Sequence, residues 1–506
     1  MLSTLVWVPI AGALLIVLLG GALNSKQLRN ISLVIAIATF GWSLFLLTKF
    51  DMGFASLQMR ESLAWLDQMG LSYRLGIDGL AFPLVLLNGL LLSIAIYIST
   101  DIQRPNLYFP LLLLLGGGVN GAFLAENLLL FFLFFEVELI PLYLLIAIWG
   151  GEKRGYAATK FLIYTAISGV LILAAFFGMA AFGSSDVSGF TFNYQDLNLE
   201  EASKTTKGIL LILLLLGFGI KIPIVPLHTW LPDAHVEAST PVSTLLAGVL
   251  LKLGTYGLLR FGLGLLPDAW QAIAPFLAGW AVVSVIYGCL TAITQTDMKK
   301  MVAYSSVGHM GYILLALATA TPLSLLGATF QMVSHGLISA LLFILVGIVY
   351  KKTGTRNLNY LNGLLNPERG LPITGSLMIL AAMASAGTPG MIGFIAEFVI
   401  FRSSFSIFPV QTILCMIGTG LTAVYFLIMI DRVFFGRFSV RKDGEKSVDL
   451  IPFAQWQEKF PAIALALIIV FFGLLPNFAT KIIESSANVI APNRTQPHQI
   501  ALFQSP

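Results

Sequence analysis

Long apolar runs separated by short polar segments dominate the chain. A helix needs about 20 apolar residues to cross the hydrocarbon core of a bilayer, and the pattern predicts about fourteen such spans. Their predicted ranges are 4–22, 31–50, 79–99, 107–124, 127–149, 156–183, 207–227, 240–264, 270–292, 300–319, 323–349, 371–401, 407–434 and 460–484. Because the connections are short, we expect one all-α integral membrane domain over residues 1–506, with no sizeable soluble domain.

The composition supports a membrane protein. Of the 506 residues, 57% are hydrophobic and 11% are charged, with a mean hydropathy of +0.88. A soluble domain carries roughly 25% charged residues, so the composition excludes a soluble enzyme, a disordered chain and a nucleic-acid-binding protein. Of the lysines and arginines, seventeen fall in one set of alternate loops, eight in the other and four within spans. The positive-inside bias predicts that the richer set is cytoplasmic and that both termini lie on the opposite face.

Two predicted spans are interrupted by proline near their middles. One contains Pro223 and Pro226, and the other contains Pro389 between residues of a small-residue segment. These spans lie five apart, and an odd offset reverses the direction in the membrane. The pattern is typical of inverted-topology repeats whose broken helices line an ion site, and it predicts two five-helix repeats at roughly 107–264 and 270–434.

Several ionisable side chains fall inside the predicted spans. A charge at the bilayer centre costs about 2.5–3.5 kcal/mol on insertion scales, so each such residue is a functional hypothesis. The set comprises Glu136, Glu138, Lys221, Lys252, His309, His335 and Glu397. Buried glutamate, lysine and histidine can all exchange protons near neutral pH, whereas arginine effectively never releases its proton. The set therefore predicts a lateral proton route in which serine and tyrosine hydroxyl groups hold bridging waters.

These residues also have structural interpretations. Glu136 and Lys221 could form a static ion pair, and Glu138, two positions further on, points from a different helix face. Four polar residues after the first break have the pattern of loop-fixing groups rather than of a metal site; these are His228, Asp233, His235 and Glu237.

The sequence offers no familiar cofactor motif. Its two cysteines form no CxxC pair. The sequence contains no Walker A motif, and no dinucleotide-binding fingerprint follows a plausible strand. We therefore expect this chain itself to bind no metal, iron–sulfur cluster or nucleotide.

Several long motifs resemble the antiporter-like membrane subunits of respiratory complex I, over nearly the whole chain. The motifs are Lys221-Ile-Pro-Ile-Val-Pro-Leu-His-Thr-Trp-Leu-Pro-Asp-Ala-His235, Leu246–Lys252, Tyr256–Arg260, Ala303–Gly311 and Ser334–Leu337. The chain length favours the M-type subunit (subunit 4), and so does Glu397, where the L-type has lysine. Carried over position by position, the resemblance implies a coupled pair, a central lysine, two connecting histidines and a terminal carboxylate, namely Glu136 with Lys221, then Lys252, His309, His335 and Glu397.

Two further stretches resemble the cyanobacterial and chloroplast branch of the family, namely Glu136–Tyr143 and Trp149–Phe161. Bacterial respiratory relatives usually lack the second glutamate of the first stretch, Glu138. The resemblance implies a thylakoid complex that passes electrons from ferredoxin or NAD(P)H to plastoquinone. It also implies iron–sulfur clusters in other subunits, L-type and N-type neighbours, and surrounding lipids. The run Lys160–Ser168 looks closer to a CO2-uptake copy than to chloroplast versions.

We therefore expect a proton-translocating subunit of an NAD(P)H-quinone oxidoreductase that has no redox centre of its own. Two other functions remain open at this point. An Mrp-type or free-standing cation/proton antiporter shares the ancestral motifs, and a non-pumping scaffold subunit would use the buried charges only structurally. Direct quinone reduction is disfavoured because the chain has no cofactor ligand set.

Overall fold

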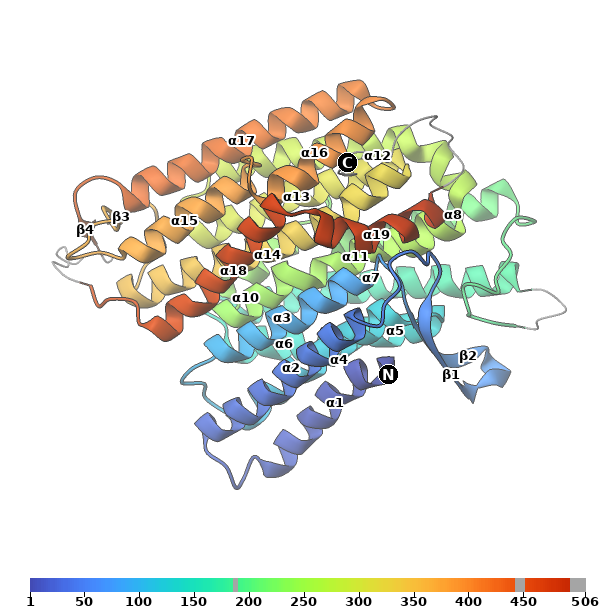
Figure 1. Cartoon of the computed structure of the whole chain (residues 1–506), viewed down its shortest axis with the longest axis horizontal. Helices are drawn as coiled ribbons and strands as arrows, with labels where there is room; N and C mark the ends of the chain where they lie inside the picture. Colours follow the sequence, from blue (N-terminus) through green and yellow to red (C-terminus); the bar gives the residue numbers. More distant parts are fainter. Residues whose placement is uncertain (185–189, 442–450, 492–506) are drawn as a thin grey trace.

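The computed structural model describes residues 1–184, 190–441 and 451–491, and it is a bundle of long helices that run side by side (Figure 1). Up to the first break, the helices are α1 (Leu2–Leu19), α2 (Ser25–Leu47), α3 (Phe82–Ile98), α4 (Pro105–Leu124), α5 (Leu128–Val137), α6 (Leu139–Trp149), α7 (Arg154–Gly183) and α8 (Lys204–Lys221). After it come α9 (Trp230–Glu237), α10 (Thr240–Leu245), the π-helical turns η2 (Leu246–Leu250) and η3 (Leu258–Leu263) on either side of α11 (Leu251–Gly257), α12 (Pro267–Ile293), α13 (Met298–Thr319) and α14 (Pro322–Thr353). The chain continues with α15 (Pro372–Ser385), α16 (Ile392–Phe405), α17 (Pro409–Phe434), α18 (Trp456–Leu474) and α19 (Asn477–Ile490).

The predicted fold class, an all-α membrane bundle, is confirmed. Among the described residues, eleven helical segments are long and apolar enough to cross a membrane, and α3 and α15 are shorter apolar helices. The count of about fourteen spans stays a prediction. Three of the basic residues behind the predicted orientation, Lys442, Lys446 and Arg494, lie outside the described part of the chain.

The helices begin where the sequence supplies a cap. Asn24 and Thr321 accept hydrogen bonds from backbone N–H groups in the first turns of α2 and α14, and Asp297 does the same for α13. Such side chains satisfy donors that have no partner inside the helix. Pro322 is at the start of α14, where its fixed φ angle suits the helix. No hydrogen bond is lost there, because a backbone N–H in the first turn has no partner inside the helix.

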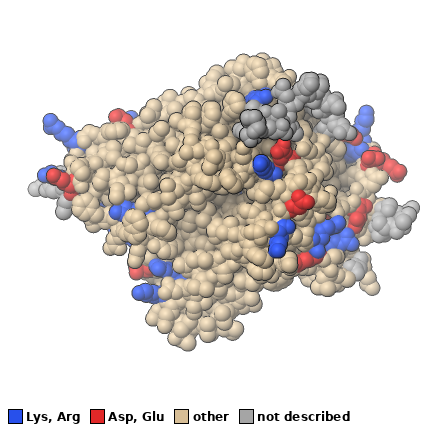
Figure 2. Space-filling view, viewed as in Figure 1, with Lys and Arg blue, Asp and Glu red and all other residues tan. Residues whose placement is uncertain are grey.

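Burial divides the bundle into a centre and a periphery. Residues 240–263, α13 and α14 are almost wholly buried, whereas most of α1, α2, α7, α12, α17 and α18 faces outward. On the face shown in Figure 2, charged side chains gather toward the two ends of the helices, and an uncharged band lies between them. The polar residues of the central helices are therefore surrounded by protein rather than by lipid.

The prediction did not include a β-hairpin that lies in the segment 51–78. Strands β1 (Gln58–Leu66) and β2 (Leu71–Ile77) pair antiparallel and project from the end of the bundle (Figure 1). The Arg60 guanidinium binds the buried Glu126 carboxylate, with Nε 3.0 Å from both oxygens. That hydrogen-bonded carboxylate raises the pKa of Arg60, although partial burial opposes the shift. A second small sheet pairs β3 (Leu361–Asn362) with β4 (Ser439–Val440).

The last predicted span, 460–484, has the wrong end: α18 (Trp456–Leu474) is long and apolar enough to cross a membrane, but it does not extend to residue 484. Helix α18 ends at Leu474 and a separate helix, α19, begins at Asn477. Pro476 has no N–H to donate to the carbonyl four residues earlier, so a continuous helix would lose a hydrogen bond at this point. Helix α19 instead lies across the bundle against α3 and α14 (Figure 1).

Gly79 allows α19 to approach the start of α3. Its N–H donates to Ser486 Oγ at 2.9 Å, and a Cβ at this position would collide with the Ile482 carbonyl. We expect Gly79→Ala to lower stability by about 1–3 kcal/mol, as overpacking does, measured as a lower Tm of the protein in detergent. Gly279→Ala is the control, because nothing lies within 4 Å of its Cβ. Equal Tm values for the two variants would contradict this packing.

Candidate functional site

The first helix break places Lys221 at the last position of α8. Pro223 and Pro226 lack the N–H groups that would continue the helix, so the chain turns and restarts as α9 at Trp230. Lys221 is 1% exposed and forms an ion pair with Glu138. Its Nζ also lies 4.9 Å from the centre of the Phe135 ring. A buried ammonium is thus held between a carboxylate and an aromatic face.

The carboxylate in contact with Lys221 is that of Glu138, whereas the sequence predicted Glu136. Glu138 is fully buried at the junction of α5 and α6, where Pro141 leaves the Val137 carbonyl without its usual helical donor. Glu136 is half-buried, and its carboxylate packs on Gly169 of α7, where a Cβ would overlap it. It still interacts electrostatically with Lys221. Lys221 therefore has two carboxylates within reach.

Lys252 lies in α11, directly after the π-helical turn η2, and it is fully buried. Its Nζ donates to the Ala247 carbonyl of that turn and lies 2.8 Å from His335 Nδ1. π-helical turns displace backbone carbonyls from the regular ladder and are frequent at functional sites. No carboxylate among the described residues forms an ion pair with Lys252.

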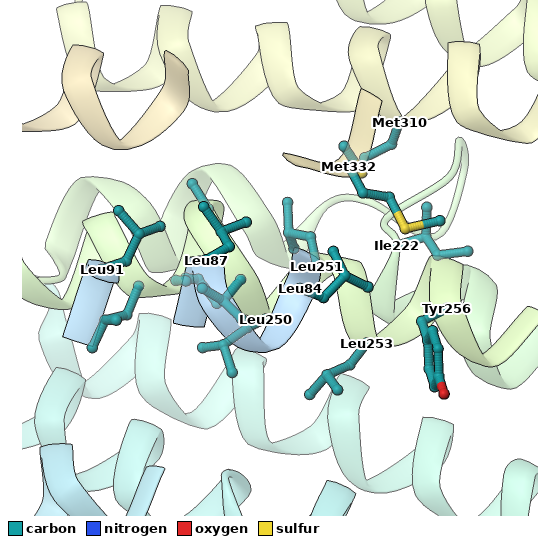
Figure 3. Close-up of a cluster of buried hydrophobic side chains, with 14 of the residues drawn as sticks. Leu84, Leu87, Leu91, Ile222, Leu250, Leu251, Leu253, Tyr256, Met310 and Met332 are labelled. Atoms are coloured by element: carbon teal, nitrogen blue, oxygen red, sulfur yellow. The ribbon is translucent and has the colours of Figure 1, made fainter. Parts of the chain in front are cut away.

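Apolar side chains surround the helix that carries Lys252. Figure 3 shows Leu84, Leu87 and Leu91 of α3, Met310 of α13 and Met332 of α14 in one buried cluster with apolar residues of the segment 250–256. Ile222, next to Lys221, belongs to the same cluster. No direct hydrogen bond joins Lys221 to Lys252 in the described part of the chain.

His335 and His309 continue from Lys252 toward the second break. Their ring centres are 5.5 Å apart, and His309 Nε2 lies 3.0 Å from Ser385 Oγ. His309 Nδ1 lies 3.6 Å from Glu397 Oε1, which is too long for a direct hydrogen bond. A row of side chains, from Lys252 through both histidines to Glu397, thus crosses four helices.

A small cavity lies among these groups. Its volume is about 10 Å³, room for about one water molecule, and its lining includes both histidines, Gln331, Ser334 and Glu397. Four lining atoms, His309 Nδ1, His335 Nε2, Ser334 Oγ and Gln331 Oε1, are buried without a partner among the described residues. Buried polar atoms are almost always hydrogen-bonded, so this lining suits a bridging water.

The second break positions Glu397. Helix α15 ends at Ser385 and α16 begins at Ile392, with Pro389 between two glycines in left-handed conformation. At Gly387, φ is 66° and a Cβ would lie 2.9 Å from Glu397 Oε2, so a side chain there would be strained and crowded. The Thr419 hydroxyl on α17 donates to Glu397 Oε2 at 2.9 Å and lies 3.3 Å from the Tyr312 hydroxyl.

The structure therefore places five of the six predicted proton-transfer residues in two contact groups, with the sixth, Glu136, beside the first. Sequence reasoning missed Ser385, Gln331 and Thr419, because an isolated polar residue in an apolar run gives no distinctive signal. His235, interpreted as a loop-fixing residue, is fully buried, stacks on Phe343 at 4.5 Å, and has no hydrogen-bond partner for either ring nitrogen among the described residues. Asp233 pairs with Lys160 at 2.7 Å.

Comparison with known proteins agrees with the geometry. The profile of the family "NADH:quinone oxidoreductase/Mrp antiporter, TM" matches residues 125–423. NAD(P)H-quinone oxidoreductase chain 4 of Thermosynechococcus vestitus is 41% identical over 97% of this chain and 91% of its own length. The Nostoc chain of the same name is 39% identical over 100% of this chain and 94% of its own.

Solved structures show the same fold. A chain of respiratory complex I from Thermus thermophilus is similar with a TM-score of 0.86 and 26% identity, over 97% of this chain and 99% of its own length. A chain of the Mrp complex from Dietzia has the same TM-score at 21% identity, over 97% of both chains, and shows the fold alone. This chain therefore belongs to the NADH:quinone oxidoreductase/Mrp antiporter transmembrane family, among the chain 4 subunits of NAD(P)H-quinone oxidoreductase.

Proposed function

We propose that this chain moves protons through the membrane arm of a photosynthetic complex I while other subunits reduce the quinone. The observation that carries the proposal is the row from Lys252 to Glu397, in which ionisable groups are buried in protein and separated by hydrogen-bond or single-water distances. Such groups are costly inside a membrane, and a purely structural role would favour complete pairing. Here Lys252 has no carboxylate partner among the described residues.

From Lys252 onward, the proposed proton route follows the contacts of the site. When a change in the neighbouring charge weakens the ion pair of Lys221, its proton moves toward Lys252. From Lys252 Nζ the proton passes to His335 Nδ1, 2.8 Å away, and a water in the small cavity links His335 to His309. His309 then delivers it to Glu397, from which it leaves on the lumenal side.

The relatives suggest the membrane and the complex in which this chain works. Chains of this name in cyanobacteria suggest a thylakoid membrane, plastoquinone as electron acceptor and iron–sulfur clusters held by other subunits. L-type and N-type antiporter-like subunits would be the neighbours within the membrane, with lipids around them. The uneven lysine and arginine content supports lumenal termini. A CO2-uptake form of the complex is the finer proposal, and copurification of a carbonic-anhydrase-like subunit would support it.

Glu397→Gln tests the route at its end. We expect proton release by this subunit to fall roughly 10²-fold, the usual contribution of a positioned acid or base, because the amide cannot carry a proton. The measurement is the number of protons moved per electron by the whole complex in vesicles. Glu368→Gln, on the loop before α15 and exposed, is the control. A wild-type ratio in Glu397→Gln would contradict the proposal.

A cation/proton antiporter is the second candidate, since a chain of an Mrp complex shares the fold over nearly its whole length. Sodium-dependent proton exchange by the purified chain alone would favour it. A scaffold role would instead be favoured if neutralising the buried charges reduced assembly while the proton ratio per assembled complex stayed unchanged.

A further inference from the structure

The two carboxylate oxygens of Glu397 have different neighbours. Oε1 lies 3.6 Å from His309 Nδ1, and both residues line the small cavity. Oε2 accepts a hydrogen bond from the Thr419 hydroxyl of α17 at 2.9 Å. One oxygen therefore faces the row of ionisable groups, and the other is held by a neutral hydroxyl group outside that row.

Thr419 differs from two other threonines of α17 in what its hydroxyl binds. Thr412 and Thr422 donate to carbonyl groups four residues earlier in their own helix, at 2.7 Å to Phe408 and at 3.1 Å to Gly418. This is the usual hydrogen bond of a threonine inside a helix. The Thr419 hydroxyl donates to α16 instead, so its hydrogen bond joins two helices at the carboxylate.

Tyr312 of α13 supports the Thr419 hydroxyl. Its side chain is buried, and its hydroxyl lies 3.3 Å from Thr419 Oγ1, the only hydrogen-bond partner that the described residues give it. A hydroxyl group has one proton, and Thr419 donates its proton to Glu397, so Tyr312 is the donor of the second hydrogen bond. Two hydroxyl groups in series thus direct their protons toward Oε2, and hydrogen bonds in such a chain strengthen one another.

Two glycines leave room for these three side chains. At Gly387, a Cβ would lie 2.9 Å from Glu397 Oε2 and 3.4 Å from Thr419 Cγ2. At Gly418, a Cβ would lie 3.0 Å from the Tyr312 hydroxyl and would collide with Val285 of α12. The second helix break and the close packing of α17 on its neighbours therefore both place the Thr419 hydroxyl against the carboxylate.

The terminal torsion of a glutamate side chain has only a broad preference, so an unheld carboxyl group would present either oxygen to His309. Proton transfer needs its groups held within about 0.5 Å of the productive geometry. We propose that Thr419 is a positioning residue of the proton route, which holds Oε2 so that Oε1 exchanges the proton with His309, and that Tyr312 acts through Thr419. This rests on the proposed proton-moving function. The arriving proton binds Oε1, and Oε2 becomes the carbonyl oxygen of the neutral acid, which still accepts from Thr419.

Acid-minus-alkaline infrared difference spectra of the whole complex test the hydrogen bond directly. The C=O band of protonated Glu397 is identified by its loss in Glu397→Gln. A carbonyl oxygen that accepts a hydrogen bond absorbs at lower frequency, so we expect this band to move to higher frequency in Thr419→Val. Thr419→Ser keeps the hydroxyl group and should return the band close to its wild-type frequency. Thr412→Val is the matched control, because it makes the same change at a fully buried position of the same helix.

The ratio of protons to electrons in vesicles is the second readout. We expect Thr419→Val to lower proton movement by this subunit roughly 10-fold, because it removes one hydrogen bond to a charged group. Thr419→Ser and Thr412→Val should keep nearly the wild-type ratio. Tyr312→Phe removes the longer hydrogen bond and should have a smaller effect. Combined with Thr419→Val it should cause no further loss, because residues that act through one another are not additive.

Three results would overturn the inference: an unshifted band in Thr419→Val, a wild-type proton ratio in that variant, or an equal loss in Thr412→Val. Additive losses in the double variant would overturn the role of Tyr312. If the wild-type complex shows no band that Glu397→Gln removes, Glu397 does not take up a proton, and the proposed function is refuted instead.

Discussion

Lys252→Met should abolish proton movement by this subunit while the complex still assembles and reduces quinone. The methionine is unbranched and of similar length, so it fits the fully buried space that Lys252 occupies. It has no ionisable group, which removes the donor 2.8 Å from His335 Nδ1. Because no described carboxylate pairs with Lys252, the variant also removes an uncompensated buried amine, and we expect no loss of Tm.

The ratio of protons to electrons in vesicles containing the whole complex measures this effect. Lys49→Met, at an exposed position after α2, is the matched control and should keep the wild-type ratio. Lys252→Arg adds a sharper test, since arginine keeps the positive charge and effectively never releases a proton. A complex with Lys252→Arg that still moves protons normally would show that Lys252 acts only through its charge.

Lys221→Met should stop proton movement equally, and unlike Lys252→Met it should also destabilise the protein. It removes the counter-charge of fully buried Glu138, and breaking a buried pair from one side costs about 3–5 kcal/mol. The Tm of the purified complex and the proton ratio measure the two effects separately.

The double variant Lys221→Met with Glu138→Gln distinguishes stability from transport. It leaves no buried charge behind, so we expect most of the lost Tm to return while proton movement stays absent. If the double variant recovers proton movement as well, Lys221 is a structural residue and not part of the route.

The sequence correctly predicted the features that depend on residues close together in the chain. The apolar runs predicted the membrane bundle, and the prolines at 223, 226 and 389 predicted where two helices break. Lys252, His335, His309 and Glu397 stood out because ionisable residues are rare in apolar spans. The structure brings these four together across α11, α14, α13 and α16.

The remaining features depend on contacts between distant segments. Whether Glu136 or Glu138 meets Lys221 is decided by how α5 and α8 pack, which two nearby acidic positions do not reveal. Thr419 lies 22 residues from Glu397, and only the packing of α17 on α16 brings its hydroxyl to the carboxylate. The β-hairpin of residues 58–77 was also missed, although the apolar residues Leu71, Tyr73, Leu75 and Ile77 of its second strand alternate with other residues, as is typical of a strand.

Two π-helical turns flank α11, and they make the number of residues in the apolar segment 246–263 important to the structure. Each turn accommodates one residue more than a regular α-helix would, and one residue corresponds to a rotation of about 100°. Loss of a single leucine from Leu246–Leu250 would convert the turn to regular α-helix, in which the Ala247 carbonyl that accepts from Lys252 Nζ returns to the backbone hydrogen-bond ladder. The number of residues in this segment is therefore as important to the site as its lysine.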